Sequence, residues 1–287
     1  MRIAVYGSRR QDNYLPEIEA FMKRLAQMGV EVVMHPKLYK YLQAVMLPAL
    51  AAVRRVTDSS DFTADAAVSI GGDGTFLRTA MGVSRSDIPI LGVNTGHLGY
   101  MTALSVDRLS EVPELIMSGT LSYERRGLIE VVSPEIKTWP FALNEVTISK
   151  DDSASMIDAM TYLDGIHLAD YCADGLIIAT PTGSTAYNLS VGGPVIQPQT
   201  RVWVISPIAA HTLTMRPLVI SDSSSLSILP QARAEHFRLT LDGRSVSLPV
   251  GTEIRLRRAD FDVKVFHLPG SSFIETLRNK LHWGIEQ

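Results

Sequence analysis

The 287-residue chain contains only one cysteine, Cys172. A lone cysteine excludes an internal disulfide and a zinc site built from cysteines, and it fits a reducing compartment. Long hydrophobic runs are also missing: none approaches the roughly 20 residues needed to span a bilayer. The segment Met1–Gly7 reads as a first strand, with no apolar signal region before it. The sequence therefore predicts a cytoplasmic protein with no membrane partner.

An excess of charge of one sign is absent as well. Lys and Arg number 27 and Asp and Glu number 30, which gives a formal net charge of −3. Without a basic field, nucleic acid is not an expected partner. Arginine pairs do occur, for example Arg9–Arg10 and Arg125–Arg126, and one of them could face a polyanionic ligand. The 46% hydrophobic content is ample for a sizeable core, and the length suits one large or two ordinary domains.

The first third of the chain alternates between strand-like and helix-like spacing of apolar residues. Strands are expected at Ile3–Tyr6, Val30–Met34, Val68–Ile70 and Ile90–Val93. Helices are expected at Ile18–Met28, Leu38–Val56 (with a break or kink at Pro48), Phe76–Met81 and Val106–Met117. Alternation of this kind indicates a doubly wound sheet with right-handed crossovers. We therefore predict a Rossmann-like α/β domain over residues 1–122.

After about Gly119, short apolar and β-branched segments are separated by turn signals. The expected strands are Leu128–Val132, Ala142–Ile148, Met160–Leu163, Gly175–Ala179, Val202–Ile205, Leu226–Leu229, Phe237–Leu241 and Val263–Val265. The pattern predicts a β-rich domain, a β-sandwich, over residues 123–267. Helical spacing returns at Ser271–Trp283, and we expect residues 268–287 to pack back on the first domain.

Three glycines surround one carboxylate in the segment Ala67–Leu77. The apolar run that ends at Ile70 reads as a strand, and a helical pattern begins near Thr75. Glycine lets backbone amides approach a ligand closely, and a helix start presents unpaired N–H groups to an anion. Gly71, Gly72 and Thr75 are therefore expected to form a phosphate loop. Gly-Gly-Asp-Gly can also be a tight turn with no ligand, but its place between a strand and a helix favours the phosphate site.

Asp73 carries negative charge into this expected anion site. The carboxylate would repel a phosphate unless a divalent cation, or a proton taken from an attacking hydroxyl, offsets the charge. A second loop follows the next strand, and its supporting residues would be Asn94, Thr95, Gly96 and Leu98. Because ligands of such sheets bind beyond the carboxyl ends of the strands, we expect both loops to line one crevice.

Two further groups of polar residues interrupt apolar segments. Thr180–Tyr187 is a run of hydroxyls and glycine between a strand core and a possible helix. Such a run can bind sugar hydroxyls and phosphates, and Tyr187 could stack on a base, although serine and threonine also cap helices without any ligand. Asn144 and Glu145 break a strand pattern, where the alternation of side chains would turn one of them outward in any case.

Taken together, these motifs resemble the NAD kinase family in identity and order, and the resemblance runs from the first strand to the terminal helix. The Gly71–Gly74 pattern is shared with lipid kinases and phosphofructokinases, whereas Thr180–Tyr187 is far more specific. Further landmarks that look like those of the family are Gly192-Gly193-Pro194, His211-Thr212-Leu213 and Arg216-Pro217-Leu218.

The resemblance implies ATP-dependent phosphorylation of the 2′-hydroxyl of the adenosine ribose of NAD, which yields NADP. It implies Asp73 as the general base, Mg²⁺ or another divalent cation on the phosphates, and a homodimer or homotetramer. The residues implied to hold the dinucleotide are Gly74, Asn144, Glu145, Asp174, Thr185, Ala186, Tyr187 and Ser190.

One position departs from the family pattern. Many family members carry arginine two residues before the aspartate that matches Asp174, and this chain has Cys172 there. Another Arg or His would have to supply that charge, or the product phosphate would be held more weakly. Two alternatives stay open: a diacylglycerol or sphingoid-base kinase that shares the Gly71–Gly74 loop, and a non-catalytic NAD(P)-binding sensor.

Overall fold

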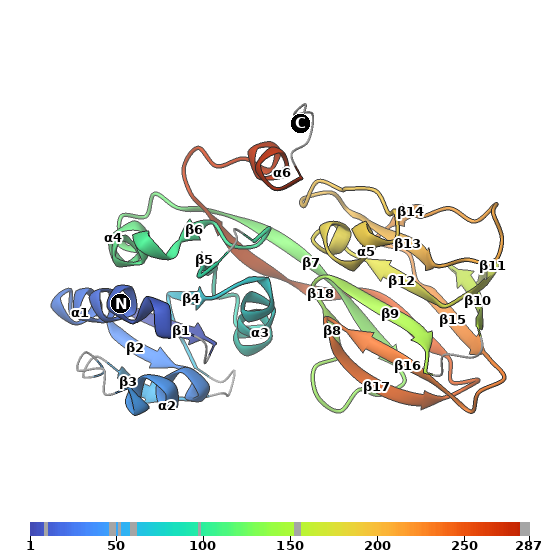
Figure 1. Cartoon of the computed structure of the whole chain (residues 1–287), viewed down its shortest axis with the longest axis horizontal. Coiled ribbons are helices and arrows are strands. Elements are labelled where there is room, and N and C mark those ends of the chain that lie inside the picture. Colours follow the sequence, from blue (N-terminus) through green and yellow to red (C-terminus); the bar gives the residue numbers. More distant parts are fainter. Residues whose placement is uncertain are drawn as a thin grey trace. The chain divides into compact units, whose positions relative to one another are not determined.

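The computed structural model describes residues 1–8, 11–45, 50, 53–57, 62–96, 99–151 and 156–281. The chain forms two compact units (Figure 1). The first consists of Met1–Arg125 together with Val263–Gln287, and the second of Arg126–Asp262. Each unit has a hydrophobic core of its own.

The first unit is built on a parallel sheet. Its strands are β1 (Arg2–Gly7), β2 (Glu31–Met34), β3 (Val53–Val56), β4 (Ala66–Ile70) and β5 (Ile90–Asn94), in the order β3-β2-β1-β4-β5. Every neighbouring pair in this order is parallel. β6 (Leu104–Ser105) and the end of β18 (Ile254–His267) also pair with β5. The chain leaves β1 toward one edge and later fills the other, so the predicted doubly wound, Rossmann-like topology is confirmed.

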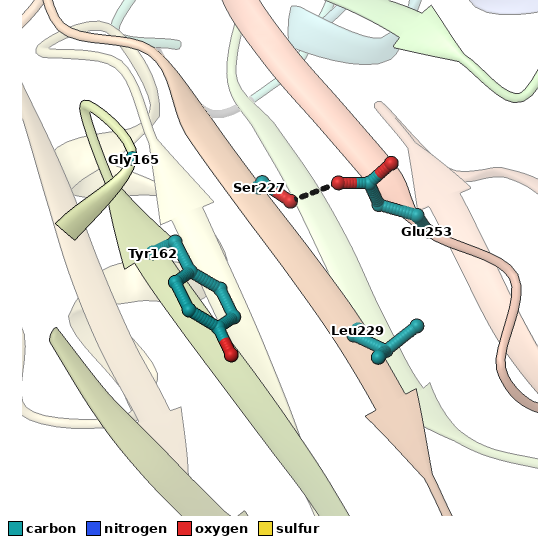
Figure 2. A pocket seen from close by; sticks show the side chains of 5 residues that line it. All are labelled: Tyr162, Gly165, Ser227, Leu229 and Glu253. Carbon is teal, nitrogen blue, oxygen red and sulfur yellow. Dashed lines mark hydrogen bonds between the residues drawn. The ribbon is translucent and has the colours of Figure 1, made fainter. Parts of the chain in front are cut away.

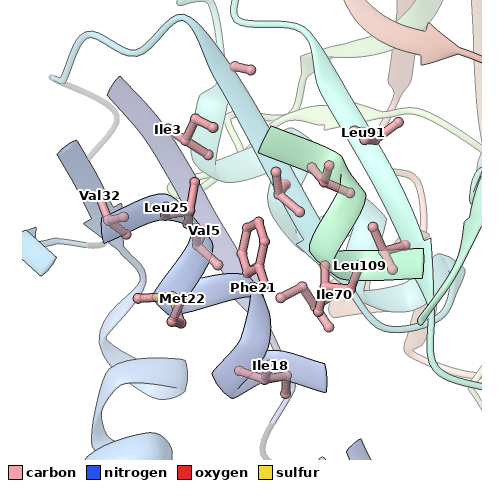
Figure 3. Packing of buried hydrophobic residues seen from close by; sticks show 14 of the residues in the cluster. Ile3, Val5, Ile18, Phe21, Met22, Leu25, Val32, Ile70, Leu91 and Leu109 are labelled. Carbon is pink, nitrogen blue, oxygen red and sulfur yellow. The ribbon is translucent and has the colours of Figure 1, made fainter. Parts of the chain in front are cut away.

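Helices cover both faces of this sheet. On one face, α1 (Leu15–Gln27), with the 3-10 segment η1 (Asp12–Tyr14) before it, packs beside η3 (Val106–Glu111) and α4 (Val112–Met117). Figure 3 shows the apolar side chains of α1 against those of the strands, with Phe21 at the centre. On the opposite face, α3 (Asp73–Val83) approaches β1 so closely that a Cβ on Gly82 would lie 2.6 Å from the ring of Tyr6.

The expected helix at Leu38–Val56 is wrong over its second half. Helix α2 is Pro36–Ala44, and Val53–Val56 is strand β3, which pairs in parallel with β2. β2 needs a partner at that edge, and valine at both ends of a four-residue segment suits a strand. Pro48 lies outside the described residues. Two smaller differences occur: α3 begins at Asp73, and the expected helix at 106–117 starts as the 3-10 segment η3.

The second unit is a sandwich of two sheets. One sheet has six antiparallel strands in the order β14-β13-β12-β9-β16-β17. Their bounds are β9 (Glu145–Lys150), β12 (Gly175–Ala179), β13 (Val202–Ile208), β14 (Leu218–Ser221), β16 (His236–Leu241) and β17 (Arg244–Pro249). The other sheet contains β7 (Ser122–Ser133), β8 (Phe141–Ala142), β10 (Ile157–Leu163), β11 (Ile166–Ala173), β15 (Leu226–Gln231) and the first part of β18. Alternate apolar residues of both sheets share one core, so the predicted β-sandwich is confirmed.

The strand expected at Ala142–Ile148 is divided into two pieces. β8 ends at Ala142 and β9 starts at Glu145, which leaves Leu143 and Asn144 outside the ladders. A short segment made of η4 (Gly183–Thr185) and α5 (Tyr187–Ser190) packs against β12. The polar motifs of the second unit therefore lie where strands stop.

The terminal helix α6 (Phe273–Leu281) belongs to the first unit. The hydroxyl of Ser272 accepts a hydrogen bond from the backbone N–H of Glu275, so the helix is capped locally. None of its residues is buried, while Leu268 just before it packs on the first core. The last two residues of the expected helix lie outside the described residues. Among the helices described, none combines the length and apolar character that a membrane crossing requires.

Candidate active site

The Gly71–Gly74 loop joins β4 to α3. The backbone N–H of Gly71 donates to the carbonyl of Val93 on β5, at 2.8 Å. Gly71 has φ of 147°, and a Cβ there would lie 2.5 Å from Oγ1 of Thr75. Conformation and space therefore both require glycine at this position. A Cβ at Gly72 or Gly74, in contrast, would meet no atom of another described residue within 4 Å, apart from its chain neighbours and the helix's own backbone, so the loop has open space on its outer side.

Asp73 is the first residue of α3, and its carboxylate is held by a second loop. The backbone N–H of Tyr100 donates to Oδ2 at 3.1 Å, and that of Met101 donates to Oδ1 at 3.2 Å. Gly99 lies so close that a Cβ there would overlap the Asp73 carboxyl group. The backbone N–H of Gly99 in turn donates to the hydroxyl of Thr102, at 2.8 Å. The side chain of Asp73 is thus fixed at a helix N-terminus beside open space.

The predicted supporting residues Asn94, Thr95 and Gly96 shape a turn and do not contact Asp73 in the described structure. Asn94 is buried, and its side-chain amide closes on Gly96: Oδ1 accepts from the N–H at 3.1 Å, and Nδ2 donates to the carbonyl at 3.2 Å. Asn94 therefore shapes the turn. Thr95 is half-buried beside it, and Leu98 lies outside the described residues. Among the described residues, those that touch Asp73 include Gly99, the last residue of the expected loop, and Tyr100 and Met101, which the sequence reading did not single out.

In the second unit, Asp242 organises the Asn144-Glu145 segment. Its carboxylate accepts hydrogen bonds from the backbone N–H groups of Leu143, Asn144 and Glu145, at 2.7, 2.8 and 3.2 Å. These bonds take the place of ladder bonds for the residues that follow β8 and precede β9, which explains why the expected strand is interrupted. The sequence marked Asp242-Gly243 only as a turn, and Asp242 does occupy one, with φ of 47°.

Glu145 is a half-buried acid with a fully buried Oε2 atom, and it lies beside a second half-buried acid, Asp242. Burial, and then the charge of Asp242, raises the pKa of Glu145 to about 7, while the backbone N–H of Tyr187 lowers it. Burial also raises the pKa of Asp242, and its three backbone donors and Arg244 oppose that shift. Within the described part of the chain, Oε2 of Glu145 and Oδ1 of Asn144 are buried without a hydrogen-bond partner. Buried polar atoms without partners are candidates for contact with a ligand.

The start of the hydroxyl-rich block Thr180–Tyr187 is locked onto the same segment. The backbone N–H of Thr180 donates to the carbonyl of Asn144 at 2.8 Å, and its hydroxyl donates to the carbonyl of Leu143 at 2.5 Å. A Cβ at Gly183 would overlap the carbonyl of Asn144, so this approach needs glycine. The structure thus brings together two of the predicted groups, Asn144-Glu145 and Thr180–Tyr187.

The later residues of the block, and the other residues implied to hold the dinucleotide, lie in differing environments. The hydroxyl of Thr185 donates to the carbonyl of Thr182 at 3.3 Å, which is a bond within the block itself. Ala186 is half-buried, and Tyr187 and Ser190 are exposed, Tyr187 by 45%. Asp174 forms an ion pair of 2.6 Å with Lys150. These predicted residues are therefore on the surface or engaged with neighbours, whereas Asn144 is buried and Glu145 is half-buried with a buried Oε2 atom.

A family model described as the ATP-NAD kinase N-terminal domain matches residues 10–121, and one described as the ATP-NAD kinase C-terminal domain matches residues 143–268. The chain belongs to the NAD kinase family. It is 38% identical to the NAD kinase of Bacteroides fragilis strain YCH46 over 288 residues, which cover 100% of this chain and 99% of that protein. The NAD kinase of Porphyromonas gingivalis strain W83 is 40% identical over 283 residues, 99% of this chain and 98% of that protein.

Solved structures agree with the NAD kinase assignment. A yeast NADH kinase complexed with NADH has the same fold, with a TM-score of 0.89 at 22% identity, over 100% of this chain and 89% of that one. An NAD kinase from Archaeoglobus fulgidus in complex with ATP gives a TM-score of 0.73 at 27% identity, with 98% of each chain covered. The chain is accordingly an enzyme, a kinase, and the lipid-kinase alternative is set aside.

At the position where NAD kinases often carry arginine, Cys172 lies opposite Asp158 on the neighbouring strand. A hydrogen bond with Asp158, followed by burial, raises the pKa of the thiol. The residue is therefore a neutral thiol rather than a reactive thiolate. A cation does lie by the hydroxyl-rich block: Arg126 is buried and donates to the hydroxyl of Thr182 at 3.3 Å, and burial lowers its pKa to about 9.

A hollow of about 520 Å³ lies on the second unit and is separate from these residues. Figure 2 shows its lining, in which the hydroxyl of Ser227 is bonded to Glu253 and Tyr162 lies on the neighbouring strand. None of the predicted site residues lines it. It therefore has no part in the assignment of the active site.

Proposed function

We propose that this chain transfers the γ-phosphate of ATP to the 2′-hydroxyl of the adenosine ribose of NAD, giving NADP and ADP. The observation that carries the proposal is the placement of Asp73, a carboxylate held by two backbone N–H groups at the start of α3. Beside it, Gly72 and Gly74 leave open space. The NAD kinase relatives and the Archaeoglobus fulgidus enzyme in complex with ATP support the same substrates.

In the proposed reaction, Asp73 is the general base. Its carboxylate takes the proton of the 2′-hydroxyl while the ribose oxygen bonds to the γ-phosphorus and the bond from that phosphorus to the β,γ-bridging oxygen breaks. Phosphoryl transfer depends mainly on positioning and on neutralisation of charge, so a carboxylate that is a weak base suffices once the hydroxyl is aligned. The loop of Gly71, Gly72 and Thr75 at the start of α3 would lie beside the phosphates, although the N–H groups of Gly71 and Thr75 already donate to the carbonyls of Val93 and Gly72.

The dinucleotide would be held by residues of the second unit. Asn144 and Glu145 offer buried oxygen atoms without partners among the described residues, which suits the hydroxyls and amide of NAD. Tyr187 is exposed and available to stack on a base. We extend the proposal to Gly74, Asp174, Thr185, Ala186 and Ser190 on the strength of the family resemblance.

Magnesium, or another divalent cation, would be carried mainly by the phosphates of ATP. The residues that the structure describes contain no cluster of three side chains suited to hold a metal. This fits Mg²⁺ in kinases, which keeps several waters and binds one or two carboxylates together with the substrate phosphates. Asp73 is the carboxylate of the loop, and the ion would supply neutralisation of the transferred charge.

The decisive experiment incubates the purified protein with NAD, ATP and Mg²⁺ and measures NADP with an NADP-specific dehydrogenase. Asp73→Asn should lower kcat at least about 100-fold, the scale of losing a general base, while NAD still binds. Asp107→Asn, at an exposed aspartate of η3, is the matched control and should keep full activity. NADP formation at the normal rate by Asp73→Asn would remove Asp73 from the mechanism. Absence of NADP formation by the wild-type protein, with NAD still bound, would favour the non-catalytic sensor.

We also propose a homodimer or homotetramer in the cytoplasm, as the family resemblance and the single cysteine suggest. Light scattering coupled to size-exclusion chromatography tests the assembly. A mass near the 31.5 kDa of one chain would exclude it.

A further inference from the structure

The terminal helix α6 brings an ammonium group to the side of the Asp73 site. Nζ of Lys280 lies 4.5 Å from the centre of the Tyr100 ring. Tyr100 is the residue whose backbone N–H donates to Asp73. The helix is capped locally by Ser272, and its side chains are at most half-buried, Phe273 and Leu277 among them. The contact between Lys280 and the ring of Tyr100 places α6 next to the residues that hold Asp73.

Within the described part of the chain, the charge of Lys280 forms no ion pair. The ammonium nevertheless lies in the field of Asp73: burial lowers the pKa of Lys280, and the charge of Asp73 raises it. Burial and the same carboxylate raise the pKa of Tyr100. Asp73, Tyr100 and Lys280 therefore form one electrostatic group.

A nucleoside triphosphate that approaches Asp73 meets a carboxylate of its own sign. The two backbone N–H groups on Asp73 hold it in place but carry no net charge. A cation beside the carboxylate would offset the repulsion, and a lysine that has not already paired is the kind of group that binds a phosphate as a point charge. The aromatic ring of Tyr100 lies against the ammonium group and restricts the side chain, which reduces the entropy lost on binding.

We propose that Lys280 of the terminal helix is a phosphate-binding residue for the nucleoside triphosphate donor, held beside Asp73 by the ring of Tyr100. This inference rests on the proposed function, because it assigns a role in binding the donor of that reaction. It gives α6 a function in the site of the first unit, to which both the helix and the Gly71–Gly74 loop belong.

The test compares three variants of the full-length protein. Lys280→Met keeps a long unbranched side chain and removes the charge, and Lys280→Arg keeps the charge. Arg278→Met, on the same helix, removes a neighbouring exposed cation and is the control. Steady-state kinetics should show that Lys280→Met raises KM for ATP roughly 10- to 100-fold, the scale of one charge-assisted hydrogen bond, with KM for NAD unchanged. Lys280→Arg should recover most of the loss, and Arg278→Met should behave as wild type.

Titration calorimetry with a non-hydrolysable ATP analogue and Mg²⁺ keeps this inference separate from the proposed function. Weaker binding of the analogue by Lys280→Met supports the role of Lys280 whatever the acceptor proves to be. An unchanged affinity and an unchanged KM for ATP would overturn it, even with NADP formed by the wild type. A fall in kcat alone would also overturn it, because that result is expected when Lys280 only braces Tyr100 and Asp73.

Discussion

The carboxyl group of Asp73 occupies the space that a side chain on Gly99 would need. Replacing Gly99 by alanine must therefore move either the carboxylate or the loop that donates to it. A displacement of about 1 Å at a reacting group can cost about 100-fold in rate. We predict that Gly99→Ala lowers kcat for NADP formation about 100-fold, measured under saturating NAD and ATP.

A matched substitution separates this effect from a general effect of replacing glycine. A Cβ at Gly127, on β7, would lie 3.4 Å from the nearest atom of Arg258, which is ordinary contact. Gly127→Ala should keep both activity and stability, because alanine is no worse than glycine in a strand. If Gly99→Ala retained full activity, the tight contact between Gly99 and Asp73 would have no catalytic meaning.

Asp242 is predicted to control affinity for NAD through the backbone of Leu143–Glu145. Asparagine fits the same shape and tolerates positive φ, but it has one acceptor oxygen where Asp242 uses two, so Asp242→Asn leaves at least one of the three backbone N–H groups facing an amide NH₂. We expect a raised KM for NAD, an unchanged KM for ATP, and a loss of about 1–3 kcal/mol in the free energy of unfolding, the scale of an unsatisfied buried group.

The control for Asp242→Asn is Asp164→Asn, at a second Asp-Gly turn. Asp164 also has positive φ, of 51°, and accepts from the N–H of Ser225, but it is exposed. Exposed groups can be resolvated by water, so the cost should be smaller and KM for NAD should not change. Equal effects of the two substitutions would show that the turns matter only for folding.

The parts of the fold that could be predicted are those set by local pattern. The apolar run, the glycines and the helical spacing of Ala67–Leu77 are adjacent in sequence, so the strand, loop and helix followed from them. The prediction of a helix at Val53–Val56 was wrong because the segment pairs with β2, which lies elsewhere in the chain. Pairing at the edge of the sheet outweighed the helical spacing of its residues.

The site could be predicted only in part for the same reason. Asp73 and Asn144-Glu145 are visible as polar groups that interrupt apolar runs. The groups that hold them are distant in sequence: Tyr100 and Met101 for Asp73, and Asp242 for Glu145. Backbone N–H donors leave no trace in residue identity, and an aspartate in a turn looks like any other turn aspartate.

Phe21 is predicted to contribute strongly to the folding stability of the first unit. It is fully buried, and Figure 3 shows it between α1 and the strands. Phe21→Ala should lower the free energy of unfolding by about 3–5 kcal/mol, the usual cost of deleting a buried aromatic ring. Ile274→Ala, at a residue of α6 that is 61% exposed, should cost about 0.5 kcal/mol or less. Urea denaturation followed by circular dichroism measures both, and similar losses would contradict the described packing.

The half-buried acid Glu145 predicts a stability that falls as pH rises. Its pKa is raised from an ordinary value of 4.5 to about 7 in the folded protein. Below pH 4.5 both states hold the proton, and the protonated acid costs nothing. Between pH 4.5 and 7 the unfolded chain releases a proton that the folded protein keeps, so the free energy of unfolding decreases with pH. Above pH 7 the accumulated loss is up to about 3 kcal/mol.

Glu145→Gln removes this titration while it keeps the shape of the side chain. The variant should match the wild type in stability near pH 5 and exceed it near pH 8, with Glu235→Gln, at an exposed position, as the control that shows no such difference. The comparison is made by urea denaturation of each protein at both pH values, so that other titrating groups cancel in the difference. A wild type that gains stability relative to Glu145→Gln as pH rises would mean that Glu145 is stabilised as a carboxylate, and that its burial beside Asp242 does not govern its charge.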